Sequence, residues 1–132
     1  MHLTLVLLST YISLFDWKYH RISNNCLLIS FVVLTAVGRI TDSELHIVGS
    51  MIVLLICLVG YKFGLGAGDV KLIVLLSTFF LPNTSAGLVD LVGGFAVASL
   101  ILISLHRLKG RSLGDPIALA PAICAAFIWC AR

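Results

Sequence analysis

The stretch AGLVDLVGGFAVASLILISL, residues 86–105, is 20 residues long and carries a single charged side chain, Asp90. A bilayer core about 30 Å thick is crossed by roughly 20 helical residues, so this stretch predicts a membrane-spanning helix. The whole chain agrees, because 60% of its 132 residues are hydrophobic and 11% are charged. Soluble domains carry about 25% charged residues, and disorder needs high charge with low hydrophobicity. The composition therefore excludes both an ordinary soluble protein and a disordered chain.

Other apolar runs accompany this stretch. They are Leu3–Phe15, Cys26–Val37, Ile47–Gly60, Val70–Leu81 and Ile117–Trp129. Six full spans need about 120 residues, so the spans must be short, the bilayer locally thin, or one run must not cross. The runs are continuous and do not alternate apolar with polar residues, which argues against a transmembrane barrel. We predict an all-α, polytopic membrane helix bundle of about six transmembrane helices, forming one domain over residues 1–132.

The positive charges predict how these helices are oriented. With loops assigned to alternate sides, seven of the nine Lys and Arg residues fall on one side, and Arg39 and Arg132 fall on the other. The seven are Lys18, Arg21, Lys62, Lys71, Arg107, Lys109 and Arg111. Short loops rich in Lys and Arg remain in the cytoplasm. We therefore expect a multi-pass protein of the cell (inner) membrane with both termini outside. A cleaved signal peptide is not expected, because no Lys or Arg precedes Leu3.

Three acidic residues fall at the expected cytoplasmic boundary. Asp115 precedes Pro116, which fits the N-cap and first position of a helix. Asp69 follows Gly66-Ala67-Gly68 and can be explained as a plain N-cap. Asp16 ends the first apolar run, where the helix dipole disfavours an anion, so capping does not explain it. An ion pair with a neighbouring basic residue and simple solvation both remain open for Asp16.

The topology makes Asp16 and Asp69 informative as a pair. Between them the chain is expected to cross the membrane twice, which returns both carboxylates to one face. Two carboxylates held close together cannot both ionise cheaply and share a proton near neutral pH. Aspartic proteases use such a pair to deprotonate water and protonate the leaving group. Gly66 and Gly68 would allow a bound peptide or the partner carboxylate to approach the backbone closely.

The segment Gly66-Ala67-Gly68-Asp69-Val70-Lys71 resembles the GxGD motif of membrane aspartic peptidases, and in particular the type IV prepilin peptidase family. In that family the first Asp is followed shortly by Ile-Pro-Asn, and here Asp16 is followed by Ile22-Ser23-Asn24. The stretch Leu119–Ala122 resembles the proline-containing final helix of the family. The resemblance implies that Asp16 and Asp69 are the catalytic pair, supported by Gly66, Gly68, Lys71 and Asn24.

The resemblance also implies an activity and a partner. The expected reaction is removal of the basic leader from pilin-like precursors at the cytoplasmic face of the lipid bilayer, without a metal or organic cofactor. The short chain is similar to the branch that serves Flp-type or tight-adherence pili, and archaeal preflagellin peptidases are a related alternative. No nucleic acid is expected as a partner.

The chain departs from longer family members in two ways. Those members carry paired CxxC motifs in a cytosolic domain and also methylate the new N-terminus. Here Cys26, Cys57, Cys124 and Cys130 form no CxxC pair, so a zinc site is not supported. We expect a peptidase without methyltransferase activity. Ser23 replaces the proline of the family pattern, which bears on the loop geometry after Asp16.

Two other classes of function compete with a peptidase. The chain could be a non-enzymatic assembly subunit of a pilus or secretion apparatus, in which the acids serve as caps and pairing sites. A proton-coupled transport subunit is weaker, because it would prefer a carboxylate deep within a span. Asp90 alone comes near such a position. Lys71 could offset charge on the acid pair, anchor the motif loop, or be an ordinary lysine at the inner face.

Overall fold

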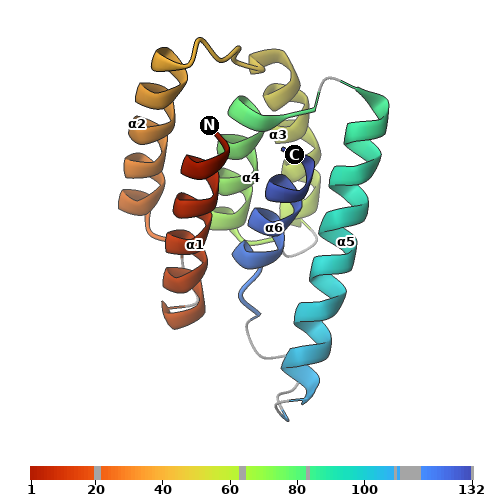
Figure 1. The fold of residues 1–132 in the computed structure, drawn as a ribbon. Helices are drawn as coiled ribbons and strands as arrows, with labels where there is room; N and C mark the ends of the chain where they lie inside the picture. Colours follow the sequence, from red (N-terminus) through yellow and green to blue (C-terminus); the bar gives the residue numbers. More distant parts are fainter. Residues whose placement is uncertain (20–21, 63–64, 83, 109, 111–116, 132) are drawn as a thin grey trace.

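The computed structural model describes residues 1–19, 22–62, 65–82, 84–108, 110 and 117–131. Within these ranges all regular secondary structure is helical, in six helices that run alternately down and up (Figure 1). The helices are α1 (His2–Tyr19), α2 (Asn24–Ile40), α3 (Ile47–Lys62), α4 (Ala67–Phe80), α5 (Ser85–Leu108) and α6 (Ala120–Cys130). The predicted all-α fold is confirmed.

The alternating order divides the connections between two ends of the bundle. Both chain termini and the α2–α3 and α4–α5 connections lie at one end, which we call the upper end (Figure 1). We call the opposite end the lower end; there α1 ends at Tyr19 and α4 begins at Ala67. Asp16 and Asp69 are therefore both near the lower end, as the double crossing between them predicts.

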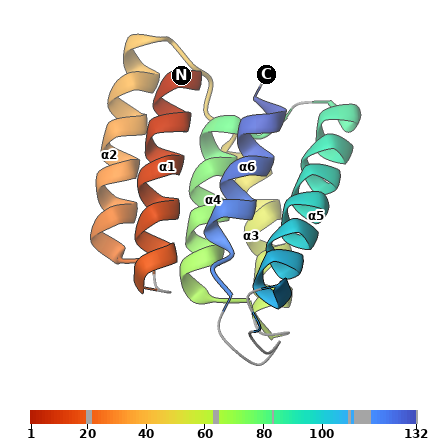
Figure 2. The ribbon, with the colours of Figure 1, turned by 60° about the horizontal axis from the view of Figure 1, so that its bottom comes forward.

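Helices α4 and α6 form the centre of the bundle. Helix α6 packs against α1, α4 and α5, and helix α4 packs against α2, α3 and α6. Figure 2 shows the two central helices between the α1–α2 pair and α5. The core between the helices is built mainly from the buried side chains Leu5, Ile12, Leu34, Leu72, Leu76, Phe79, Ile123 and Phe127. Gly94 of α5 faces the backbone of Ala126 in α6, where a small residue allows close helix contact.

Local sequence explains where several helices begin and end. Ser23 is the N-cap of α2, and its hydroxyl accepts a hydrogen bond from the Asn25 N–H at 3.3 Å. Helix α4 ends at Phe80, two residues before Pro82, which has no N–H to continue a helix. Helix α6 begins at Ala120, with Pro121 in its first turn, where a missing N–H costs little.

The start of α6 corrects one prediction from the sequence. The final apolar run was expected to become helical from about Ile117, with Asp115 as its N-cap. The N-cap of α6 is instead Leu119, and Pro121 lies in the first turn of this helix, where proline is favoured. Asp115 and Pro116 lie outside the described residues.

One helix of the described residues, α5, is long and apolar enough to cross a membrane by length and composition. Helices α2, α3 and α6 are apolar but shorter, with 17, 16 and 11 residues. At 1.5 Å per residue, α6 is about 16 Å long, roughly half the thickness of a bilayer core. A topology of about six spans with both termini outside therefore stays a prediction.

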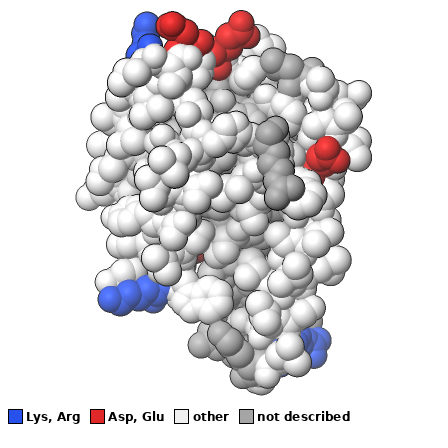
Figure 3. Space-filling model, in the orientation of Figure 1, with Lys and Arg blue, Asp and Glu red and all other residues white. Residues whose placement is uncertain are grey.

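The surface suits contact with lipid. Large apolar side chains are exposed on the outward faces of α1, α2, α3 and α5, to an extent that soluble monomers rarely show. On the face drawn in Figure 3, charged side chains gather toward the two ends, with mostly uncharged atoms between them and an acidic side chain on one flank.

Candidate active site

Asp16 lies on the buried face of α1. Leu5, Ser9, Ile12 and Asp16 recur at helical spacing and are the buried residues of this helix. Only 4% of Asp16 is exposed, so a solvated surface carboxylate does not describe it. Its Oδ2 atom accepts a hydrogen bond from the backbone N–H of Ala120 at 3.1 Å.

This hydrogen bond joins Asp16 to the start of α6. The first N–H groups of a helix have no partner within the helix, and the N-cap residue Leu119 supplies no side-chain cap. The carboxylate of Asp16, which belongs to α1, serves as the missing cap by accepting a hydrogen bond from the first N–H of α6. The N-terminus of a helix carries partial positive charge, so this position stabilises a negative charge on Asp16.

Asp69 lies in the first turn of α4, three residues after the N-cap Gly66. The plain N-cap explanation from the sequence is therefore wrong in position. The Asp69 carboxylate instead accepts a hydrogen bond from the backbone N–H of Gly66, as the third residue of a capping box does. Asp69 thus helps to start α4 while it remains near Asp16.

The surroundings of Asp69 favour its protonated form. It precedes the apolar run Val70–Leu81 and lines a cavity whose wall includes the apolar side chains of Phe15 and Ile22. Burial and the nearby negative charge of Asp16 raise the pKa of Asp69 to about 6, although the Gly66 hydrogen bond acts in the opposite direction. Asp69 therefore holds a proton over a pH range in which an ordinary Asp is ionised.

A cavity of about 680 Å³ at the lower end contains both carboxylates. All six residues that the sequence predicted for the site line it: Asp16, Asn24, Gly66, Gly68, Asp69 and Lys71. The side chains of Phe15, Tyr19, Ile22, Ser23, Ile117 and Leu119 complete most of its wall. One cavity thus receives residues from α1, α2, α4 and the segment before α6.

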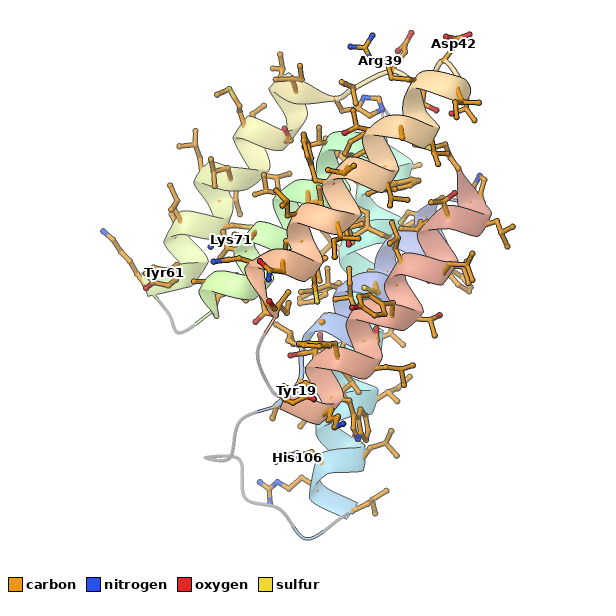
Figure 4. All side chains as sticks on the ribbon, turned by 90° about the vertical axis from the view of Figure 1, so that its left-hand side faces the viewer. Tyr19, Arg39, Asp42, Tyr61, Lys71 and His106 are labelled. Carbon is orange, nitrogen blue, oxygen red and sulfur yellow. The ribbon has the colours of Figure 1, made fainter. Side chains whose placement is uncertain are left out.

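Lys71 and Asn24 bridge two helices at the rim of this cavity. The Lys71 Nζ donates a hydrogen bond to Asn24 Oδ1 at 2.9 Å, between α4 and the first residue of α2. Figure 4 shows Lys71 at the α4 end that faces the start of α2, far from Arg39 and Asp42 at the upper end. Lys71 therefore has a defined partner and is placed at the site.

The two glycines of the motif have separate steric roles. A Cβ atom at Gly68 would lie 3.1 Å from the Cβ of Ile22, so Gly68 lets α4 approach the α1–α2 connection closely. A Cβ atom at Gly66 would lie 2.8 Å from Oδ2 of Asp69. The absent side chain at Gly66 therefore leaves room for the carboxylate itself.

Gly66→Ala tests this clearance. We expect the added methyl group to displace the Asp69 carboxylate and to lower the rate of any reaction that depends on it, by about 10²-fold for a shift near 1 Å. Gly93→Ala is the matched control, because a Cβ atom at Gly93 meets nothing within 4 Å. Activity assays of both variants check the prediction, and equal activity in Gly66→Ala and Gly93→Ala would contradict it.

Ser23 keeps the backbone geometry that a proline would impose. Its φ is −69° and its ψ is 139°, and a proline ring fixes φ near −65°. The replacement of the family's proline by serine therefore does not disturb the path from α1 to α2, and it adds the hydroxyl that caps α2.

The Ala120 N–H is a site group that the sequence did not predict. In the sequence, Leu119–Ala122 only resembled the proline-containing final helix of the family. Nearly every residue type has a backbone N–H, so the residue type does not indicate which N–H donates to the site. Among the described residues no group of three or more His, Cys, Asp or Glu side chains could hold a metal ion. Cys26, Cys57 and Cys124 are buried free thiols, and Cys130 is a partly buried one.

A family model described as the type IV leader peptidase family matches residues 3–89. The chain belongs to this family. The type IV leader peptidase match contains both Asp16 and Asp69 and ends before α6. Membership points to a peptidase of the prepilin leader type and implies pilin-like precursors as substrates. Comparisons with curated proteins and with solved structures find no match.

Proposed function

We propose that this chain is an aspartic endopeptidase that removes the basic leader of a type IV, Flp-like pilin precursor at the cytoplasmic face of the membrane. The observation that carries this proposal is the position of Asp16 and Asp69 in one cavity, each held by a backbone N–H of a helix start. Family membership supports the peptide substrate. The geometry supports two carboxylates as the reacting groups.

The two carboxylates have different surroundings, which suits a division into base and acid. Asp16, stabilised as an anion by the start of α6, accepts a proton from water while the water oxygen bonds to the scissile carbonyl carbon. Asp69 gives its proton to the carbonyl oxygen. The C–N bond then breaks, the leaving nitrogen takes the proton from Asp16, and Asp69 recovers a proton from the former carbonyl oxygen. Both groups return to their starting states.

We place the lower end of the bundle in the cytoplasm. The described basic residues at the lower end are Lys18, Lys62, Lys71 and Arg107, and Arg39 lies at the upper end. Basic residues near short loops favour the cytoplasmic side. The leader of the precursor would then meet the cavity from the cytoplasm, and both termini would lie outside.

Co-expression with a pilin-like precursor tests the proposal. The wild-type chain is expected to lower the precursor mass by the mass of its leader, read by mass spectrometry. A non-enzymatic assembly subunit, the alternative from the sequence, would leave the mass unchanged. An unchanged precursor mass, with both proteins present in the membrane fraction, would therefore contradict the peptidase.

Cleavage should depend on pH through Asp69. Below a pH of about 6 Asp69 holds the proton that the reaction needs, and above it the carboxyl ionises because its pKa is raised only that far. We expect the rate of the purified chain to fall up to about tenfold for each pH unit above this value. A rate that stays constant from pH 5 to pH 8, with the precursor intact and bound, would contradict this assignment.

A further inference from the structure

A second hollow of about 390 Å³, between α2 and α4, adjoins the acid cavity. Asn24 and Lys71 line both spaces, so the Lys71–Asn24 hydrogen bond lies at the boundary between them. We call the second hollow the α2–α4 groove. Its remaining lining residues are Leu27, Leu28, Phe31, Val74, Leu75 and Thr78.

Each wall of the α2–α4 groove is one face of one helix. The α2 wall is formed by residues 24, 27, 28 and 31, and the α4 wall by residues 71, 74, 75 and 78. Both sets follow the i, i+3, i+4, i+7 spacing of a single helix face. Seven residues of helix span about 10 Å, so the groove runs along the bundle from the polar rim toward its apolar middle.

The chemistry of the groove changes along this length. At its lower end Lys71 offers an ammonium donor and Asn24 an amide that both donates and accepts. Above them the walls are almost entirely apolar, and the hydroxyl of Thr78 already donates to Val74 O at 2.9 Å. Leu28 and Phe31 are exposed on the outer side of the groove.

This sequence of environments fits a peptide that is helical in lipid and extended at the cavity. An apolar helix needs only apolar contacts from its surroundings, because its backbone groups pair internally. Where such a helix unwinds, its N–H and C=O groups need new partners. The Lys71 and Asn24 side chains provide donors and an acceptor at that point.

We propose that the α2–α4 groove receives the apolar helix of the precursor next to the scissile bond, and that the chain unwinds at Lys71 and Asn24 to enter the acid cavity. This inference rests on the proposed peptidase function and adds the path of the substrate. The Lys71–Asn24 hydrogen bond opens when the unwound segment takes its place. Lys71 and Asn24 are positioning residues in this account.

The main competitor is a hollow between α1 and α6, lined in part by Ser9, Ser13, Pro121 and Cys124. It shares no lining residue with the acid cavity. A helix bound there would not contact Lys71 and Asn24, which line the acid cavity and the α2–α4 groove. Binding at the α1–α6 hollow is therefore an outcome of the test that would overturn the proposal.

Photo-cross-linking with matched positions distinguishes these sites. A photo-reactive phenylalanine analogue is placed at Leu28 in the α2–α4 groove, at Leu14 in the α1–α6 hollow, or at Leu100 on α5, with an Asp69→Asn substitution to keep the precursor intact. The three leucines are 65%, 67% and 64% exposed, so simple exposure predicts equal labelling. We expect at least about tenfold more cross-linking to the precursor's apolar helix from Leu28. Equal labelling, no labelling, or strongest labelling from Leu14 would overturn the groove.

Cleavage of the same precursor by the chain without these substitutions is measured in parallel. If that chain cleaves and Leu28 does not cross-link preferentially, the groove is wrong and the peptidase stands. If Leu28 cross-links preferentially and no cleavage occurs, the groove stands and the proposed function fails.

Leu28→Trp gives a kinetic readout of the groove in the otherwise wild-type chain. The larger side chain should obstruct the groove and raise KM for the full precursor about tenfold with kcat nearly unchanged. A short peptide that contains the cleavage site without the apolar helix should be cleaved as well as by wild type. Leu100→Trp should change neither value. An unchanged KM for the full precursor, or an equal loss for the full precursor and the short peptide, would contradict the groove.

Discussion

Asp69→Asn is expected to stop precursor cleavage, with a rate loss of about 10³-fold or more, while the chain remains folded and inserted. Asn retains an oxygen that can accept the Gly66 N–H, so the start of α4 is preserved. Asn cannot give up and recover the proton that the carboxyl transfers, and general acid–base catalysis contributes about 10²–10⁴-fold for each group. A time course of leader release in membranes containing equal amounts of each variant measures the loss.

Asp90→Asn is the control for Asp69→Asn. Asp90 is an exposed acid of α5 and lines none of the acid cavity, so its substitution should leave the rate within about twofold of wild type. Cleavage at the wild-type rate by Asp69→Asn would show that Asp69 takes no part in the reaction. Equal loss in both variants would point to charge or folding rather than to the acid pair.

Substitution of Asp16 is expected to separate catalysis from stability. Asp16→Asn and Asp16→Ala should both lose at least about 10³-fold in rate, because neither can accept the proton of the attacking water. Asp16→Asn keeps an acceptor for the Ala120 N–H, whereas Asp16→Ala leaves that buried donor without its partner. An unmet buried donor costs about 1–3 kcal/mol. Thermal unfolding should therefore show a lower Tm for Asp16→Ala than for Asp16→Asn.

The cleavage rate and the Tm of the Asp16 variants test two separate claims. Retained cleavage by Asp16→Asn would refute the acid pair. An unchanged Tm in Asp16→Ala would show that the Asp16–Ala120 contact contributes little to the fold, without bearing on the reaction. If the two carboxylates act as a unit, the double variant with Asp69→Asn should lose no more than either single variant.

The sequence predicted the features that depend on the number of apolar runs and on the alternating direction of successive helices. Apolar runs separated by polar residues predict helices, and an even number of crossings between Asp16 and Asp69 returns both to one end. In the part of the chain that the structure describes, six helices follow one another in this order. The motif around Asp69, together with Ile22-Ser23-Asn24 after Asp16 and the expected topology, indicated the family, which the comparison confirms.

The remaining features depend on contacts between distant parts of the chain. The Ala120 donor lies 104 residues from Asp16, and Lys71 lies 47 residues from Asn24. No local pattern encodes either pairing. The start of α6 was misplaced because Ile117–Leu119 are apolar in sequence but are not helical. Because of that error, the sequence did not predict that the N-terminus of α6 donates a hydrogen bond to Asp16.

Hydrolysis by the acid pair is tested most directly with the purified chain in lipid vesicles, mixed with a purified pilin-like precursor. Mass spectrometry of the products is compared for wild type, Asp16→Asn, Asp69→Asn and Asp90→Asn. The account predicts two fragments, whose masses together equal those of the precursor and one water, for wild type and Asp90→Asn alone. Fragments of the same masses from Asp16→Asn or Asp69→Asn would contradict it.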